Sequence, residues 1–158
     1  MISMNNCDQH YENVERFNTV AGNLDSVDVK SINAQMGFIA EEFVETEEAL
    51  AAGDNVELLD GACDLFVTVA GLLQKLEVAG YDVDTALSRV CKNNLSKFPR
   101  TGTVDIPSVC PDNTQTVMSR DGRLVFKRAD GKVLKPKNFV PVDLSDLVPN
   151  QQFFGGVF

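Results

Sequence analysis

Apolar residues recur every three or four positions along four stretches of the first part of the chain, which is the pattern of amphipathic helices. Polar or glycine-containing segments of a few residues separate these stretches. Four helices joined by short connections predict an all-α fold whose core is an antiparallel four-helix bundle. The predicted helices run from Asp8 to about Gly22, from Asp28 or Ser31 to Ala52, from about Val56 to about Val78, and from a cap at Asp84 to about Leu95.

Residues that favour helix ends stand where the apolar pattern breaks. Either Asp28 or Ser31 is placed to cap the start of the second helix. Gly53 predicts the C-terminal stop of that helix, and Asp54 or Asn55 predicts the cap of the third. The second and third helices therefore should form a hairpin with a very short connection.

The pattern changes after residue 98. Residues 99–120 are rich in Pro, Thr and Asp and predict a loop or arm, whereas residues 1–98 form the helical core. Residues 121–158 predict a short β-hairpin and a tail, because the pairs Asp121-Gly122 and Asp130-Gly131 punctuate three extended pieces. This last segment belongs to the same domain or to a contact between copies, and the tail at residues 151–158 should pack on the bundle or on a neighbour.

The third helix has a narrow acidic stripe on a mostly apolar body. On a helical wheel the polar and small residues of the stripe fall within about 100° of arc, and almost everything else is apolar. Such a helix should be largely buried, so its carboxylates need a cation. The small residues should leave room beside the acids. The stripe consists of Glu57, Asp60, Gly61, Asp64, Thr68 and Gly71.

The second helix carries a matching set of acids. Glu41 and Glu45 are four residues apart, so they lie about 6 Å apart along one face, and Glu42 flanks them. That face lies away from the apolar stripe that includes Met36 and Phe43. Alone, it could be a solvated acidic surface; paired with the third helix, it could face the acidic stripe. Facing carboxylates without histidine favour a hard divalent cation, Mg²⁺ or Mn²⁺.

The overall charge narrows the classes of partner. The chain has 158 residues and a net charge of −9, which argues against binding of nucleic acid polymers or anionic membranes. A nucleotide remains compatible if a divalent metal bridges carboxylate and phosphate. No signal peptide or membrane span is predicted, and the four cysteines match no zinc or disulfide pattern, which favours the cytoplasm.

These acids resemble a known motif. "EEFVE" at residues 41–45 followed by "ELLD" at residues 57–60 is similar to the ExxE…ExxD pattern of the all-α nucleoside triphosphate pyrophosphohydrolases. That superfamily includes MazG, dimeric dUTPase and phosphoribosyl-ATP pyrophosphohydrolase. "YENVERFN", "VCKNNLSKF" and "DGKVLKPKNFVPVDL" resemble segments of a MazG-like, often phage-borne subgroup, so the resemblance covers most of the chain.

The resemblance implies an Mg²⁺-dependent enzyme that cleaves a nucleotide to a monophosphate and pyrophosphate, in the cytoplasm of a cell or of a phage's host. The apolar area that the second and third helices would expose on their own predicts a homodimer or a homotetramer. Glu42 or Glu45 would act as the general base. Whether Asp60 or Asp64 is the closer ligand stays open, because Gly61 stands where the family has Glu. The implied metal ligands are Glu41, Glu42, Glu45, Glu57, Asp60 and Asp64, and the candidate substrate-binding residues are Asn94, Lys97, Lys132 and Lys135.

Two alternatives stay open at this level. Phosphoribosyl-ATP pyrophosphohydrolase activity would use the same fold and the same acids. A non-enzymatic helical interaction protein with acidic faces would need no metal at all. The sequence does not name the nucleotide base.

Overall fold

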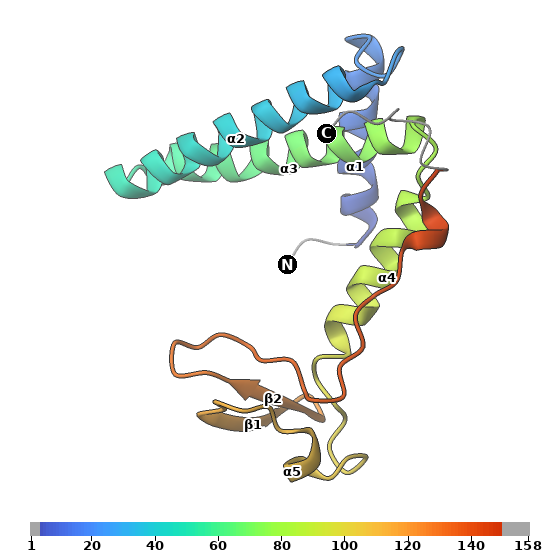
Figure 1. Cartoon of the computed structure of the whole chain (residues 1–158). Coiled ribbons are helices and arrows are strands. Elements are labelled where there is room, and N and C mark those ends of the chain that lie inside the picture. The colour runs from blue at the N-terminus through green and yellow to red at the C-terminus, as the bar shows by residue number, and fades with distance from the viewer. Residues whose placement is uncertain (1–3, 150–158) are drawn as a thin grey trace. The chain divides into compact units, whose positions relative to one another are not determined.

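The computed structural model describes residues 4–149, with side chains from Asp8 onward, and it is mostly helical with one small sheet (Figure 1). The prediction of a helical fold with a short hairpin is confirmed at this level. The predicted tail at residues 151–158 lies outside the described residues. The elements are α1 (Met4–Val20), α2 (Val29–Ala52), α3 (Asn55–Val78), α4 (Val83–Leu95), α5 (Ile106–Val109), β1 (Thr116–Arg120), β2 (Arg123–Lys127) and a 3-10 helix (Ser145–Leu147).

The chain divides into two compact units. The first comprises the described residues up to Val83, with Val148 and Pro149, and contains α1, α2 and α3. The second runs from Asp84 to Leu147 and contains α4, α5 and the hairpin. In the first unit α2 and α3 run antiparallel along their lengths, and α1 crosses α3 (Figure 1). A four-helix bundle stays a prediction.

Side-chain caps fix the ends of α2, as the sequence predicts. Asp28 is the N-cap: its carboxylate accepts a hydrogen bond of 2.7 Å from the Ser31 backbone N–H, and the Ser31 hydroxyl accepts one of 3.0 Å from the Asp28 N–H. These reciprocal bonds form a capping box, so both candidate residues take part. Gly53 ends the helix in the left-handed region at φ 70°.

The start of α4 differs by one residue from the prediction. The helix begins at Val83, so Asp84 lies in its first turn and does not precede it as a cap. A carboxylate in the first helical turn still interacts favourably with the unpaired backbone N–H groups there.

Buried polar side chains join α1 to α3. The Asn18 amide donates a hydrogen bond of 2.9 Å to Gln74 Oε1, and Gln74 Nε2 donates one of 3.2 Å to the Tyr11 backbone carbonyl. Asn18 and Gln74 are buried, at 6% and 1% exposure. Because unpaired buried amides are costly, these bonds fix how α1 crosses α3.

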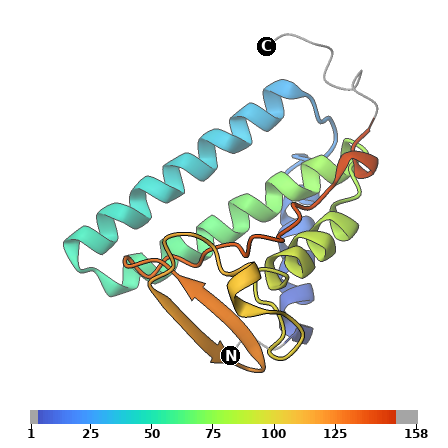
Figure 2. The same cartoon turned by 60° about the horizontal axis from the view of Figure 1, so that its bottom comes forward.

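The second unit is built on the predicted β-hairpin. Asp121 and Gly122 both have positive φ, 52° and 66°, which is the geometry of a two-residue type I′ turn. β1 and β2 pair antiparallel (Figure 2). Phe126 of β2 is fully buried and belongs to the same apolar cluster as Val109 of α5. The third predicted extended piece forms only an isolated bridge, between Val133 and Lys127.

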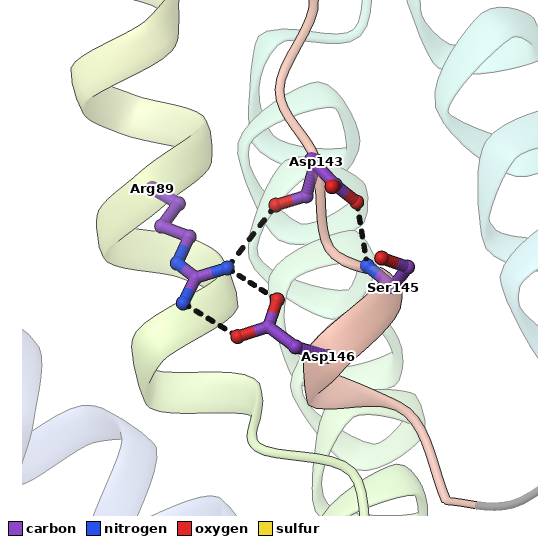
Figure 3. Close-up of polar contacts among 4 residues, drawn as sticks. All are labelled: Arg89, Asp143, Ser145 and Asp146. Carbon is purple, nitrogen blue, oxygen red and sulfur yellow. Dashed lines mark hydrogen bonds and ion pairs between the residues drawn. The ribbon is translucent and has the colours of Figure 1, made fainter.

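The segment that follows the hairpin is held along α4 by polar contacts. The Arg89 guanidinium donates to both carboxylate oxygens of Asp146, at 2.6 and 2.8 Å, and to the Asp143 carbonyl at 3.2 Å (Figure 3). The Asn93 amide donates a hydrogen bond of 2.8 Å to the Val140 carbonyl. The bidentate ion pair between Arg89 and Asp146 fixes the relative orientation of the two side chains.

The expectation that α3 is largely buried is wrong for the single chain. Its apolar residues Val56 and Leu59 are 75% and 68% exposed, and Phe66 is 45% exposed. On α2, Met36 and Phe43 are also about half exposed, at 50% and 52%. The apolar sides of the α2–α3 helical hairpin are therefore exposed to solvent in the single chain. Among the described helices, none is long and apolar enough to cross a membrane.

Candidate active site

The connection between α2 and α3 brings the two acidic helices together. Gly53 ends α2, and the carboxylate of Asp54 accepts hydrogen bonds from the backbone N–H groups of Val56 (3.0 Å) and Glu57 (3.1 Å). Asp54 is therefore the N-cap of α3, one of the two residues that the sequence offers for this role. Because the connection is so short, the helices must return antiparallel.

The two helices pack closely at the glycines of the acidic stripe. A Cβ atom at Gly61 would lie 2.5 Å from Thr46 Oγ1 and 3.3 Å from Thr46 Cα. Farther along, the Gln35 amide donates a hydrogen bond of 2.9 Å to the Thr68 carbonyl, and a Cβ at Gly71 would lie 3.1 Å from the Gln35 nitrogen. The small residues thus permit close helix packing, and the expectation that they leave room beside the acids is wrong.

Glu42 of α2 lies on the same face as Gln35 and Thr46, so it points toward α3. Its side chain is half-buried. Burial raises the pKa of the Glu42 carboxyl above its ordinary value, and the charge of Asp64 raises it further. The charges of Glu45, Glu41 and Asp60 act in the same direction.

Four of the six predicted metal ligands therefore lie near enough to a fifth, Glu42, for their charges to raise its pKa. The sixth, Glu57, is exposed in the first turn of α3 and is not among the charges that act on Glu42. The charge of Asp64 raises the pKa of Glu42 more than the charge of Asp60 does. Asp64 is also half-buried, whereas Asp60 is exposed.

The donors fit a hard divalent cation in their chemistry. All are carboxylate oxygens, and among residues 8–149 no lysine or arginine forms an ion pair with any of them. In this arrangement, however, no three His, Cys, Asp or Glu side chains of the described chain are close enough together to hold a metal ion. Binding an ion would require the carboxylates to move toward one another.

The predicted substrate-binding residues all lie in the second unit. The Lys97 ammonium donates a hydrogen bond of 2.8 Å to Asn94 Oδ1, so these two side chains lie together. The Lys135 ammonium lies 5.1 Å from the centre of the Phe139 ring, and Lys132 is exposed beside the turn at Gly131. Asn94 and Lys97 thus form one pair at the end of α4, whereas Lys132 and Lys135 belong to the segment that follows β2.

Sequence reasoning missed the polar residues that hold the helices together. Gln35 and Thr46 were not singled out, although they and Glu42 recur at seven and four residues, the spacing of one helical face. The signal available in the sequence was this polar face of α2 together with the glycines of α3, which indicates where the two helices pack. The expected apolar stripe with Met36 and Phe43 instead lies about half exposed.

Comparison with protein families assigns the paired helices. Residues 25–94 match the family model of phosphoribosyl-ATP pyrophosphohydrolase, a range that includes α2, α3 and nearly all of α4. This segment belongs to the MazG-like all-α nucleoside triphosphate pyrophosphohydrolases. Searches of curated proteins and of solved structures gave no match.

The superfamily assignment explains why the acids face one another. Members of the matched family are pyrophosphohydrolases, which are hydrolases that act on acid anhydrides. The family is generally metal-dependent, in agreement with a carboxylate cluster that lacks a cation from the chain itself. The resemblance seen in "EEFVE" and "ELLD" is thereby confirmed at the level of the superfamily.

Proposed function

We propose that the chain is an Mg²⁺-dependent pyrophosphohydrolase that cleaves a nucleoside triphosphate, or a related nucleotide, to a monophosphate and pyrophosphate. The observation that carries the proposal is the half-buried Glu42 surrounded by four other carboxylates, within the segment that matches the family. Like charges collected on a packed face are costly unless a cation joins them. A triphosphate that carries divalent metal supplies that cation.

The carboxylates of the helix pair would hold the metal. Mg²⁺, or Mn²⁺ in its place, neutralises phosphate oxygens and lowers the pKa of a bound water. Asp64 is the better candidate for the closer ligand of α3, because its charge acts on Glu42 more strongly than that of Asp60. The proposed ligand set is Glu41, Glu42, Glu45, Glu57, Asp60 and Asp64.

Glu42 is the best candidate for the general base, with Glu45 as the second. A base works best when its pKa lies nearer to the working pH, and both burial and its acidic neighbours raise the pKa of Glu42. Its half-buried position on the face toward α3 also restricts its orientation. Proton acceptance from the attacking water is therefore assigned to Glu42.

Residues of the second unit are proposed to bind the rest of the nucleotide. Lys97 and Asn94 already contact each other and could hold a phosphate and the base or sugar. Lys132 and Lys135 supply further cations. These assignments rest on residue chemistry and on the resemblance to the MazG-like subgroup.

The exposed apolar sides of α2 and α3 support assembly. Leu59, Phe66 and Phe43 together leave a large apolar surface open in the single chain. We propose that two copies cover this surface by packing their α2–α3 hairpins into a four-helix bundle. The proposed enzyme is therefore a homodimer, or a homotetramer built from dimers.

Phosphoribosyl-ATP is the second candidate substrate, and the family match itself favours it. The two candidates share the acidic site, so a single panel tests both. Purified protein is incubated with each ribo- and deoxyribonucleoside triphosphate and with phosphoribosyl-ATP in millimolar Mg²⁺, and pyrophosphate and monophosphate are measured. The proposal predicts equal amounts of the two products from at least one nucleotide, and no product when EDTA is added. Failure to cleave any nucleotide would contradict it.

A further inference from the structure

One cavity of the helical unit lies away from the acids, beside the C-terminal part of α3. It has a volume of about 270 Å³ and lies between that part of α3, the start of α2 and the α1–α2 connection. One of its walls is Lys75, which is only 5% exposed. Lysine is among the residues least often buried, so its place in a cavity wall needs a physical reason.

Among the described residues, the Lys75 ammonium has no carboxylate partner. Its Nζ donates a hydrogen bond of 2.7 Å to the backbone carbonyl of Asn23, which also lines the cavity. In the part of the chain from Asp8 to Pro149, no Asp or Glu lies within ion-pair distance of it. The Asn23 carbonyl, in the connection between α1 and α2, offsets part of the charge, but a buried ammonium is stabilised fully only by an anion.

Several other donors face the same space. Gln35 uses one amide hydrogen for the Thr68 carbonyl and keeps a second, and the Ser26 hydroxyl has no hydrogen-bond partner among the described residues. The Ser31 hydroxyl is already used, because it donates to the Asp28 carbonyl. With the two remaining hydrogens of Lys75, the cavity offers four donors to an anion.

Acidic residues of the connection do not supply the missing charge. The Asp28 carboxylate accepts the Ser31 backbone N–H at 2.7 Å, and the pKa of Asp28 is lowered chiefly by this bond. Asp25 is exposed and lies against Gly22. The charge of Lys75 therefore faces the cavity without a partner from either residue.

We propose that this cavity is a second phosphate-binding site, with Lys75 as its cation, that takes a phosphate monoester on an organic ligand. Phosphate accepts several hydrogen bonds at once and suits a convergent set of donors with one ammonium. Phe38 and Ala34 line the cavity with apolar surface, which suits the organic part of such a ligand.

The position of the cavity links it to the acidic site. Gln35, Phe38 and Glu42 lie within about 60° of arc on α2, and Gln35 is about 10 Å from Glu42 along the axis. One nucleotide could place its triphosphate at the acids and a second, distant phosphate at Lys75. This link, unlike the cavity itself, rests on the proposed function.

Calorimetric titration with ribose 5-phosphate, in the absence of divalent metal, tests the site directly. We expect binding to the wild-type chain and at least about tenfold weaker binding to Lys75→Met. Ala34→Glu places a carboxylate on the exposed rim without touching the buried lysine, so it tests the site even if Lys75→Met does not fold. Lys30→Met removes an exposed cation of α2 and is the matched control. Absence of binding at millimolar ribose 5-phosphate, or equal binding by all variants, would overturn the proposal.

Two further arms identify the source of the phosphate. Inorganic phosphate, titrated in the same way, would bind more tightly than ribose 5-phosphate if the site takes the free ion, and that result would overturn the organic ligand. If the phosphate belongs to the substrate, Lys75→Met should raise KM for phosphoribosyl-ATP about tenfold, with KM for ATP and both kcat values unchanged. Equal effects on both nucleotides would refute the link to the substrate. A wild-type chain that cleaves neither would refute the proposed function, while the titration would still decide the site.

Discussion

At the scale of single residues, Glu42 is the carboxylate of the helix pair whose charged form is disfavoured by burial and by the neighbouring acids. Its raised pKa means that the folded state binds a proton more tightly than the unfolded state. This contribution to stability is complete below the ordinary glutamate pKa of about 4.5 and is lost as the pH rises through the raised pKa. The metal-free chain should therefore lose stability over this range.

The first prediction concerns Glu42→Gln without metal. The uncharged amide removes the repulsion, so the variant should melt about 1–3 °C above the wild type at pH 7.5, with no difference near pH 4. Thermal unfolding in EDTA between pH 4 and pH 8 measures this. Added Mg²⁺ should then stabilise the wild type more than the variant. A wild type that gains nothing from Mg²⁺ would contradict the assignment of these acids.

Gly61 gives a second prediction, on packing. An alanine there would bring its Cβ to 2.5 Å from Thr46 Oγ1 and 3.3 Å from the Thr46 backbone, so Gly61→Ala should destabilise the chain by about 1–3 kcal/mol. Gly37→Ala is the control, because nothing lies within 4 Å of a Cβ at that position of α2. It should stabilise the chain by about 0.5–1 kcal/mol through helix propensity alone. Urea unfolding measures both, and equal effects would show that the helices do not meet at Gly61.

At the scale of elements, the caps of the hairpin connection hold α2 and α3 in register. Asp54 accepts two backbone N–H groups at the start of α3, so Asp54→Ala should cost about 1 kcal/mol. Asp54→Ser keeps an oxygen acceptor at the cap, so it should lower the free energy of unfolding by only a few tenths of 1 kcal/mol. Denaturant unfolding of the two variants tests the difference. If serine costs as much as alanine, the hydrogen bonds of the cap are not the cause.

Local signals predicted the elements well because caps and turns act over a few residues. Gly53, Asp54 and the Asp121-Gly122 turn each take the conformation that their residue types favour. The choice of contact faces is different. Periodicity shows that a helix has two faces, but not which face meets which neighbour, and α2 meets α3 through Gln35 and Thr46.

The acidic site could be predicted only in part, because periodicity shows the acidic stripe but not the contacts of that stripe with α2. Asp60 and Asp64 stand out on the wheel because their helix is otherwise apolar, but the influence of Asp64 on Glu42 depends on helix register. Lys75 could not be found in this way. It occurs in "LLQKLEV", where a lysine is ordinarily read as a surface charge, and only contacts with the α1–α2 connection show that it is buried.

At the scale of the whole molecule, the open apolar surface of the hairpin predicts assembly. Light scattering at micromolar concentration should give a dimer or a tetramer. Leu59→Glu puts a charge at a position that is 68% exposed in the single chain, so it should produce monomers without harming the fold. Glu48→Lys, at an exposed polar position, should leave the assembly intact. A monomeric wild type would contradict this prediction.

Catalysis by the helix-pair carboxylates is the central claim, and pyrophosphate release by matched variants tests it most directly. With the nucleotide that the wild type cleaves best, Asp64→Asn and Glu45→Gln should each lower kcat about 100-fold or more, because each removes a carboxylate that holds the metal or accepts the proton. Glu48→Gln removes an exposed carboxylate of α2, the helix that carries Glu45. The charge of Glu48 does not act on Glu42, so this variant should keep the wild-type kcat. If all three variants release pyrophosphate at the wild-type rate, the reaction does not take place at this site.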